Sequence, residues 1–243
     1  MSPDIVAGAA VKLERLQAHL SSPQLEAILT GIAGSQDSKL RELTCTGADI
    51  SGMDPEILSE ALVKLETVGG GRLSPGQVLA LFSRISESPN LRLTKLDLDW
   101  NISMVPPEMF AGALSRLERV QFWRGTGVTA DQLESLFLML FSHQVEAGGS
   151  TLTLKHVKFY GTDLTSVSLK VVVGAIQRLE EVVVWGGTVS AKQINAILTM
   201  VKDNRQGRLK DLVIFRPDVV GTVTPTLLQQ ASMNNAVRIN VMN

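Results

Sequence analysis

The sequence predicts an α/β solenoid in which short parallel strands form one wall and helices form the other. Two observations predict this class. An eleven-residue frame with apolar residues at its first, fourth, sixth and eleventh places recurs along the chain. Each copy is followed by a stretch of helical periodicity. Such a unit cannot bury its apolar face alone, so neighbouring units stack and share a continuous core.

The strand frame is clearest in LRELTCTGADI, which begins at Leu40, and its copies begin at Leu93, Leu117, Leu154, Leu179 and Leu209. Looser copies begin at Leu13 and Leu65, and VRINVMN at 237–243 is a partial one. We expect the first, fourth and sixth places to point into the core. Leu40, Leu43 and Cys45 are examples. The sequence therefore predicts about eight repeats.

The helical segments alternate between two kinds. One kind reads SSPQLEAILTGIAGS, SPGQVLALFSRISES, TADQLESLFLMLFSH and SAKQINAILTMVKDN, and the other reads DPEILSEALVKLE, VPPEMFAGALSRLE and SLKVVVGAIQRLE. Ser, Thr, Asp and Pro gather at their starts, as is typical of helix N-caps and first turns. The true unit is a pair of repeats, because 53 residues separate Leu40 from Leu93 and 52 separate Leu65 from Leu117.

A strand of the form L-x-x-L-x-L with a full helix per repeat, in two alternating helix types, resembles the ribonuclease-inhibitor class of leucine-rich repeat. The same class supplies the sensor arrays of intracellular NOD-like receptors. The resemblance implies a horseshoe with a concave parallel sheet and outer helices, and it carries no single function, because the class hosts many partners. The family's usual Asn or Cys at the ninth place occurs only as Asn101.

The repeats run through the chain without a break, so we expect one domain over 1–243. The 37-residue spacing between Leu117 and Leu154 predicts an insertion loop around 142–153. The chain also opens with SPDIVAGAAVKLE, which matches the second helix type and has no polar cap before it. We expect a piece of a longer array or an engineered one.

Composition excludes several classes of function. A net charge of −1 provides no broad cationic field for nucleic acid or for a membrane surface. Cys45 is the single cysteine, which favours a reducing compartment, and no signal peptide or membrane-spanning run is evident. We therefore expect a soluble cytoplasmic protein with neither a nucleic-acid partner nor a membrane partner.

The candidate binding residues lie at strand places that alternate away from the core. The seventh place carries Asp99, Trp123, Tyr160, Trp185 and Phe215, and Trp100 occupies an eighth place. The five aromatic residues of this set are the predicted aromatic stripe. Exposed aromatics are enriched at binding hot spots. Neighbouring solvent-facing places complete the candidate partner-binding set with Gln121, Arg124, Lys158 and Arg216.

An alternative interpretation is that these rings lean on one another, or that the register is shifted by one and they belong to the core. The third place is mostly charged with mixed sign, which indicates a solvated edge with weak cross-strand pairs.

The sequence contains no good match to a catalytic or metal-binding motif. GGGR at 69–72 lacks the Lys of a P-loop, and His19, His143 and His156 fall in different repeats. An inward Cys45 behaves as a small hydrophobe. Asn101 matches a glycosylation sequon, but at the turn place we expect its side chain to bond the backbone. We expect no enzyme activity, no metal and no cofactor.

Two hypotheses of function follow. The first is a recognition module that binds a protein partner on its concave sheet through the aromatic stripe, with a homodimer through that stripe as its variant. The second is a structural or sensor segment of a larger nucleotide-binding receptor or scaffold protein. In that case the stripe contacts other parts of the same polypeptide.

Overall fold

The computed structural model describes residues 2–10, 12–142, 153–203, 208–233 and 238–242. The predicted insertion loop around 142–153 lies outside the described residues except at Ser142 and Thr153. The chain forms two compact units, Met1–Val105 (unit 1) and Pro106–Asn243 (unit 2).

Unit 1 alternates helices and strands, and its strands pair in parallel in chain order. The register places Arg15 beside Glu42, and Val68 beside both Leu43 and Leu96. The helices are α1 (Pro3–Ala10), α2 (Ser22–Gly34), α3 (Pro55–Val63) and α4 (Pro75–Glu87). The strands are β1 (Arg15–Ala18), β2 (Glu42–Asp49), β3 (Thr67–Arg72) and β4 (Lys95–Leu98).

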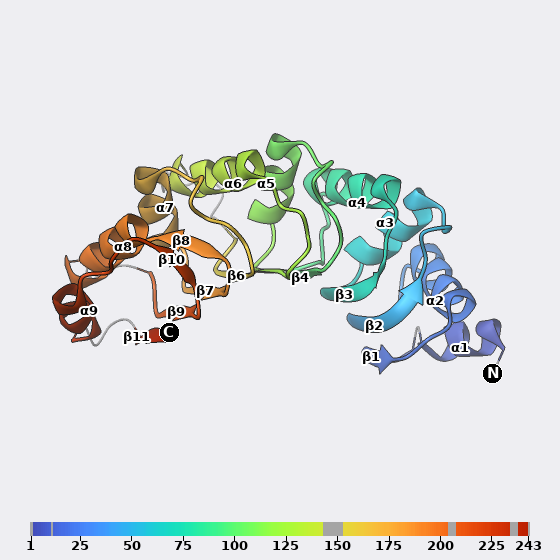
Figure 1. The fold of residues 1–243 in the computed structure, drawn as a ribbon. Helices are drawn as coiled ribbons and strands as arrows, with labels where there is room; N and C mark the ends of the chain where they lie inside the picture. The colour runs from blue at the N-terminus through green and yellow to red at the C-terminus, as the bar shows by residue number, and fades with distance from the viewer. Residues whose placement is uncertain (1, 11, 143–152, 204–207, 234–237, 243) are drawn as a thin grey trace. The chain divides into compact units, whose positions relative to one another are not determined.

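Unit 2 repeats this arrangement, with its helices in one layer and its main strands in the other (Figure 1). The helices are α5 (Pro107–Ser115), α6 (Ala130–Ser142), α7 (Leu169–Ile176), α8 (Ala191–Asp203) and α9 (Pro225–Ser232). The main strands are β5 (Arg119–Phe122), β6 (His156–Tyr160), β7 (Glu181–Trp185), β9 (Asp211–Phe215) and β11 (Arg238–Met242), paired in parallel in that order. Short strands β8 (Thr188–Ser190) and β10 (Asp218–Val220) pair separately.

The predicted strand register is confirmed by burial in β4, β5, β6 and β9, where half-exposed and buried residues alternate. In these four strands the first, fourth and sixth places are buried, as Leu117, Val120 and Phe122 illustrate. The looser copy that begins at Leu13 departs from this expectation, because Leu13, its first place, is 45 % exposed.

Two fifth places depart from the prediction that this place faces solvent: Gly69 is buried, and Val183 is only 7 % exposed. Lys158 and Val213 flank Val183 in register on the neighbouring strands, so they can cover it. The side chain of Cys45 lies outside those that the structure describes.

Aromatic rings fill the core of unit 2 between the strands and helices. Phe122 stacks on Phe159 at 5.2 Å between ring centroids. Phe110 lies 5.9 Å from Phe122, and Phe137 lies 5.9 Å from Phe159. These inward rings come from sixth strand places and from helix faces. Their packing stabilises β5 and β6 from the core side. The candidate site lies on the outward face of the same strands.

A glutamine at the third position of each first-type helix makes a hydrogen bond back to the residue before the helix. The backbone N–H groups of Ser21, Ser74, Thr129 and Ser190 donate to the side-chain oxygens of Gln24, Gln77, Gln132 and Gln193 at 2.8 to 3.1 Å. This arrangement is one half of a capping box, which satisfies backbone groups that a helix start leaves unpaired.

Three of these glutamines, Gln77, Gln132 and Gln193, are buried, and two of them join neighbouring repeats. Gln77 Nε2 donates to the carbonyls of Ile50 and Met53, both at 2.7 Å. Gln193 Nε2 donates to the carbonyls of Leu164 and Val167 at 2.8 and 2.9 Å. Gln77 and Gln193 therefore satisfy turn carbonyls of the preceding repeat. The sequence shows the recurring Gln, but it does not show these distant partners.

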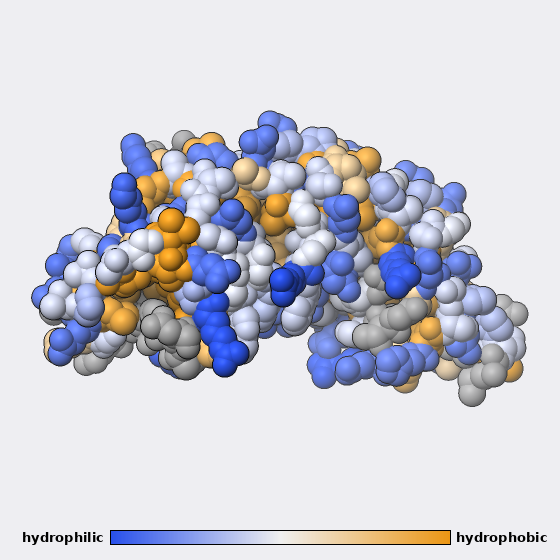
Figure 2. All heavy atoms as spheres, viewed as in Figure 1, coloured by the Kyte–Doolittle hydropathy of each residue, from blue (hydrophilic) through white to orange (hydrophobic). Residues whose placement is uncertain are grey.

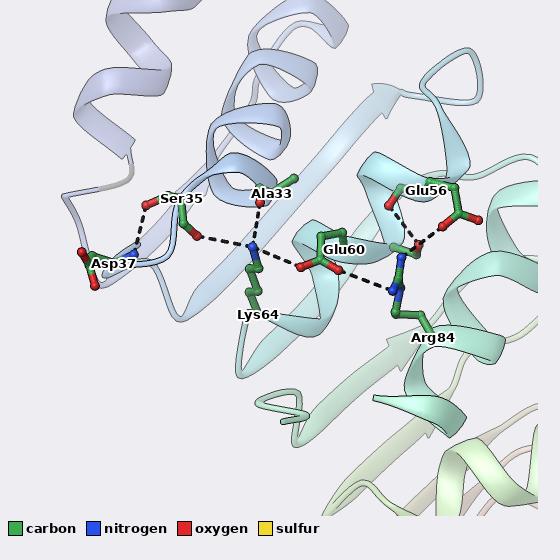
Figure 3. A network of polar contacts seen from close by, with 8 residues as sticks. Ala33, Ser35, Asp37, Glu56, Glu60, Lys64 and Arg84 are labelled. Carbon is green, nitrogen blue, oxygen red and sulfur yellow. Dashed lines mark hydrogen bonds and ion pairs between the residues drawn. The ribbon is translucent and has the colours of Figure 1, made fainter. Parts of the chain in front are cut away.

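In unit 1 a polar network joins the helix ends (Figure 3). Lys64 Nζ donates to the carbonyl of Ala33 at 2.6 Å, close to the C-terminus of α2, and forms an ion pair with Glu60 at 3.1 Å. Arg84 on α4 pairs with Glu56 at 3.0 Å and approaches Glu60 at 3.7 Å. The network links three consecutive helices and neutralises the exposed carbonyl end of α2.

Three turns that follow strands use the side chain of an Asp or Asn. Asn101 Oδ1 accepts a hydrogen bond from the Ser103 N–H at 3.0 Å, which confirms the predicted structural role of Asn101. Asp49 and Asp163 accept from the N–H groups of Ser51 and Thr165 in the same way. At Asp49, these hydrogen bonds hold the pKa of the carboxyl below its ordinary value. Within the described ranges, no helix is long and apolar enough to cross a bilayer.

Candidate functional site

Four aromatic side chains lie side by side on the outward face of unit 2. Trp123 stacks on Tyr160 at 4.5 Å between ring centroids, Tyr160 lies 6.3 Å from Trp185, and Trp185 lies 4.1 Å from Phe215. The parallel register explains the contacts, because Tyr160 pairs with Trp185 and Trp185 with Phe215 on adjacent strands. We call Trp123, Tyr160, Trp185 and Phe215 the aromatic row.

The aromatic row remains open to solvent despite these contacts. Trp123 is 42 % exposed and Trp185 is 49 % exposed, while Tyr160 and Phe215 are half-buried. Both sequence-based interpretations are therefore partly right: the rings do lean on one another, and they also present apolar surface. The shifted-register alternative is wrong for these strands, because the inward Phe122, Phe159, Val184 and Ile214 are buried.

Trp100 does not belong to this surface. It is only 4 % exposed, so the prediction that it projects into solvent with the other rings was wrong. Its strand, β4, ends at Leu98, and Trp100 stands in the bend that follows. Side chains alternate between the two faces only within a strand, so alternation does not predict the direction of a side chain at the eighth place.

Asp99 precedes Trp100 and is exposed as a residue, although its carboxyl group is partly buried. This burial raises the pKa of Asp99 above its ordinary value, and the nearby charge of Asp97 acts in the same direction. Both aspartates belong to unit 1. The structure therefore gives Asp99 a perturbed environment of its own, in a different unit from the aromatic row.

A charged row runs beside the aromatic row at the third and fifth strand places. Glu181 pairs with Lys158, whose Nζ lies 3.1 Å from Oε1. His156 Nδ1 lies 3.2 Å from Glu181 Oε2, in a direction that makes no hydrogen bond. Gln121 is half-buried beside Lys158 in the register of β5 and β6. Lys158 and Gln121 therefore lie on the predicted face, and Lys158 is already paired with a carboxylate.

Arg124 and Arg216 follow the first and last rings of the aromatic row. Both are exposed. The Arg216 guanidinium lies 5.2 Å from the Phe215 ring centroid, within range of a cation–π contact. The side chain of Arg124 leans over Gly161, since a Cβ built there would lie 3.0 Å from Arg124 Cγ. Neither guanidinium has a carboxylate partner among the residues that the structure describes.

A cavity of about 270 Å³ adjoins the aromatic row where β5 and β6 end. Trp123 and Tyr160 form its aromatic side, and the turn residues Thr126, Thr162 and Asp163 form much of the rest. Glycines with positive φ, at Gly125, Gly127 and Gly161, shape its backbone. Sequence reasoning missed this cavity, although the RGTG turn after Trp123 was a signal for it.

The other groove of note lies in unit 1 beside the polar network of Figure 3. Its volume is about 540 Å³, and Lys64, Arg84 and Arg92 line it together with Glu60 and Glu87. Ser38, which is 8 % exposed, also lines it, and its hydroxyl has no hydrogen-bond partner. The charged side chains of this groove are largely engaged with one another.

Apolar surface also gathers over β8 and β10 in unit 2 (Figure 2), where Val220 is 62 % exposed. In the described part of the chain, no three His, Cys, Asp or Glu side chains are grouped so that they could hold a metal ion. The aromatic row places four rings in mutual contact, two of them exposed, on the face that the sequence predicted for binding.

A comparison of the chain with protein-family models gives no match, and neither does a comparison with curated proteins.

Proposed function

We propose that this chain is a non-enzymatic protein-binding module of the leucine-rich repeat type, and that the aromatic row of unit 2 is its contact surface. The observation that carries the proposal is the exposure of two tryptophans, at 42 % and 49 %, within four rings in mutual contact. Large aromatic side chains dominate binding energy at protein interfaces.

The stacking supports the proposal in a second way. Rings that already contact their neighbours lose little conformational freedom when a partner covers them, so more of the burial energy appears as affinity. Burial of each exposed tryptophan by a partner contributes about 1–3 kcal/mol. Exposed apolar patches favour aggregation, so a patch of this kind indicates a binding surface.

Membership of the ribonuclease-inhibitor class of leucine-rich repeat is part of the proposal. It is supported by the L-x-x-L-x-L frame, by parallel pairing of successive strands within each unit, and by a helix between consecutive main strands. The buried glutamines take over the polar role that the family's ninth-place Asn or Cys would otherwise fill.

The test compares three proteins by light scattering after size-exclusion chromatography and by affinity capture from a cell extract. They are the wild type, Trp123→Ala/Trp185→Ala and a matched control, Leu138→Ala/Leu169→Ala. The control removes two side chains that are each 43 % exposed, on helices α6 and α7. We expect the tryptophan variant alone to lose a bound protein that the wild type and the control both retain.

Self-association through the aromatic row is the alternative outcome of this test. A wild-type dimer that becomes monomeric only in Trp123→Ala/Trp185→Ala would assign the aromatic row to contact between two copies of the chain. If all three proteins have the same mass and capture the same proteins, the aromatic row is not a contact surface and the proposal is wrong.

A further inference from the structure

We infer that the segment recognised by the aromatic row is acidic, and that its carboxylates bind Arg124 and Arg216. This inference rests on the proposed function and names the chemistry of the partner. On the outward face of unit 2, charged side chains lie beside the rings of the aromatic row.

Cations outnumber carboxylates on this face. The cations are Arg119, Arg124, Lys158, Arg216 and Arg238, and the carboxylates are Glu181, Asp211 and, in the adjoining cavity, Asp163. Glu181 is paired with Lys158 at 3.1 Å and Asp211 with Arg238 at 3.2 Å, while Asp163 accepts hydrogen bonds from Thr165. In the part of the chain described, Arg119, Arg124 and Arg216 have no carboxylate partner, and of these Arg124 and Arg216 directly follow rings of the aromatic row. Opposite charge on a partner would complement them.

The backbone at Arg216 supports a role for its side chain. The equivalent places after Tyr160 and Trp185 are Gly161 and Gly186, which adopt φ of +72° and +66°. Arg216 adopts φ of +45°, in the left-handed region where a side chain is strained and glycine is not. A strained arginine at a glycine place indicates that the guanidinium serves a purpose other than folding.

Strand geometry sets the spacing that a partner must match. Arg124 follows β5 and Arg216 follows β9, with β6 and β7 between them. Three steps of about 4.8 Å separate them by roughly 14 Å, which an extended chain spans in about four residues. The partner segment therefore carries two carboxylates about four residues apart, with apolar side chains between them that cover the rings.

A single-stranded nucleic acid is the other polymer that combines negative charge with affinity for aromatic rings. The observations favour a protein, because Trp123 and Tyr160 stack on each other with an interplanar angle of 10°. Each of the two rings thus has one face that is unavailable to a base.

The experiment uses two peptides with blocked termini, Gly-Glu-Leu-Phe-Leu-Glu-Gly and its neutral counterpart with both Glu replaced by Gln. Binding is followed by the change in tryptophan fluorescence of the full chain at low and high salt. We expect the wild type to bind the acidic peptide about fivefold more tightly, with the advantage shrinking as salt rises.

Three variants complete the design. Arg124→Glu/Arg216→Glu should abolish or reverse the preference for the acidic peptide. Lys170→Glu/Lys192→Glu changes the net charge equally on helices α7 and α8, and should keep that preference. Arg216→Gly should raise the melting temperature while it reduces the preference, because it relieves the strained backbone.

Four results would overturn the inference. The wild type could bind both peptides with equal affinity, or it could bind neither. The lysine variant could lose the preference for the acidic peptide as fully as the arginine variant does, or the wild type could bind a thymidine dodecamer more tightly than the acidic peptide. Trp123→Ala/Trp185→Ala separates the two claims, and its binding is measured by titration calorimetry alongside the wild type, because the variant lacks both reporter tryptophans of unit 2. If the wild type binds both peptides equally and this variant loses both, the acidic partner is wrong and the aromatic row remains a binding surface.

Discussion

At the scale of single residues, Gly187 shows how tightly the turns of unit 2 are packed. Its φ is +76°, and a Cβ at this position would lie 2.1 Å from the carbonyl oxygen of Thr162 and 2.6 Å from the Thr162 nitrogen. The backbones of two consecutive repeats therefore touch at a place where only glycine fits. Thr162 and Gly187 follow Tyr160 and Trp185, the middle rings of the aromatic row, by two positions each.

We predict that Gly187→Ala lowers the free energy of unfolding by about 2–4 kcal/mol, since it adds left-handed strain to a clash with backbone atoms. Denaturant titration measures the loss. Gly76→Ala is the control, because a Cβ at Gly76 meets nothing within 4 Å. Similar stabilities for the two variants would show that the turn can shift to admit a side chain.

Asp99 provides the pH-dependent prediction. Its pKa in the folded protein is raised by partial burial, so its ionisation opposes folding. Its contribution to stability is fully present below the ordinary pKa of an aspartate and is lost as the pH rises through the folded value. We predict that Asp99→Asn raises the melting temperature at pH 7 and that this gain disappears below about pH 3.9. A gain of equal size at both pH values, measured by calorimetry, would contradict the assignment.

At the scale of elements, the buried glutamines connect the start of one helix to the turn of the repeat before it. Gln193 is 3 % exposed, and the two carbonyls that it satisfies belong to Leu164 and Val167. Helix α8 is thus positioned by hydrogen bonds as well as by its apolar face. Because the turns lie beside the ends of the strands, the same bonds help to place the cavity and the aromatic row.

We predict that Gln193→Leu destabilises the protein by about 2–4 kcal/mol, because two buried carbonyls lose their donor. Gln229→Leu is the control, as Gln229 is an exposed glutamine on α9. Thermal and chemical unfolding give the two values. A Gln193→Leu variant as stable as its control would mean that water or backbone movement replaces the lost bonds.

At the scale of the whole molecule, the sequence predicts one continuous array over 1–243, while the chain forms two compact units, Met1–Val105 and Pro106–Asn243. Stacked repeats are stabilised by their neighbours, so in a continuous array a local defect is transmitted along the chain. Trp123 and Trp185 in unit 2 provide optical reporters far in sequence from Gln77 in unit 1.

We predict that Gln77→Leu lowers the denaturation midpoint seen by tryptophan fluorescence as well as by circular dichroism, with one coincident transition. The test is run in a Trp100→Phe background, so that the fluorescence comes from unit 2 alone. A fluorescence midpoint that stays at its wild-type value while the dichroism splits into two steps would show two independent domains.

The sequence alone determined the repeat period, the strand positions, the helix starts and the inward or outward direction of most strand residues. These features are local: they follow from side-chain alternation within a strand and from capping preferences at a helix start. For the same reason, strand alternation by itself assigns Trp123, Tyr160, Trp185 and Phe215 to the outward face.

The tertiary structure decided whatever depends on a neighbouring repeat. Trp100 is buried because the strand that would direct it ends at Leu98, and Val183 is buried between two flanking strands. The stacking of the rings, the pairing of Glu181 with Lys158 and the carbonyl partners of the glutamines all join residues at least 23 positions apart. Periodicity specifies which way a side chain points, but packing between repeats determines what it meets.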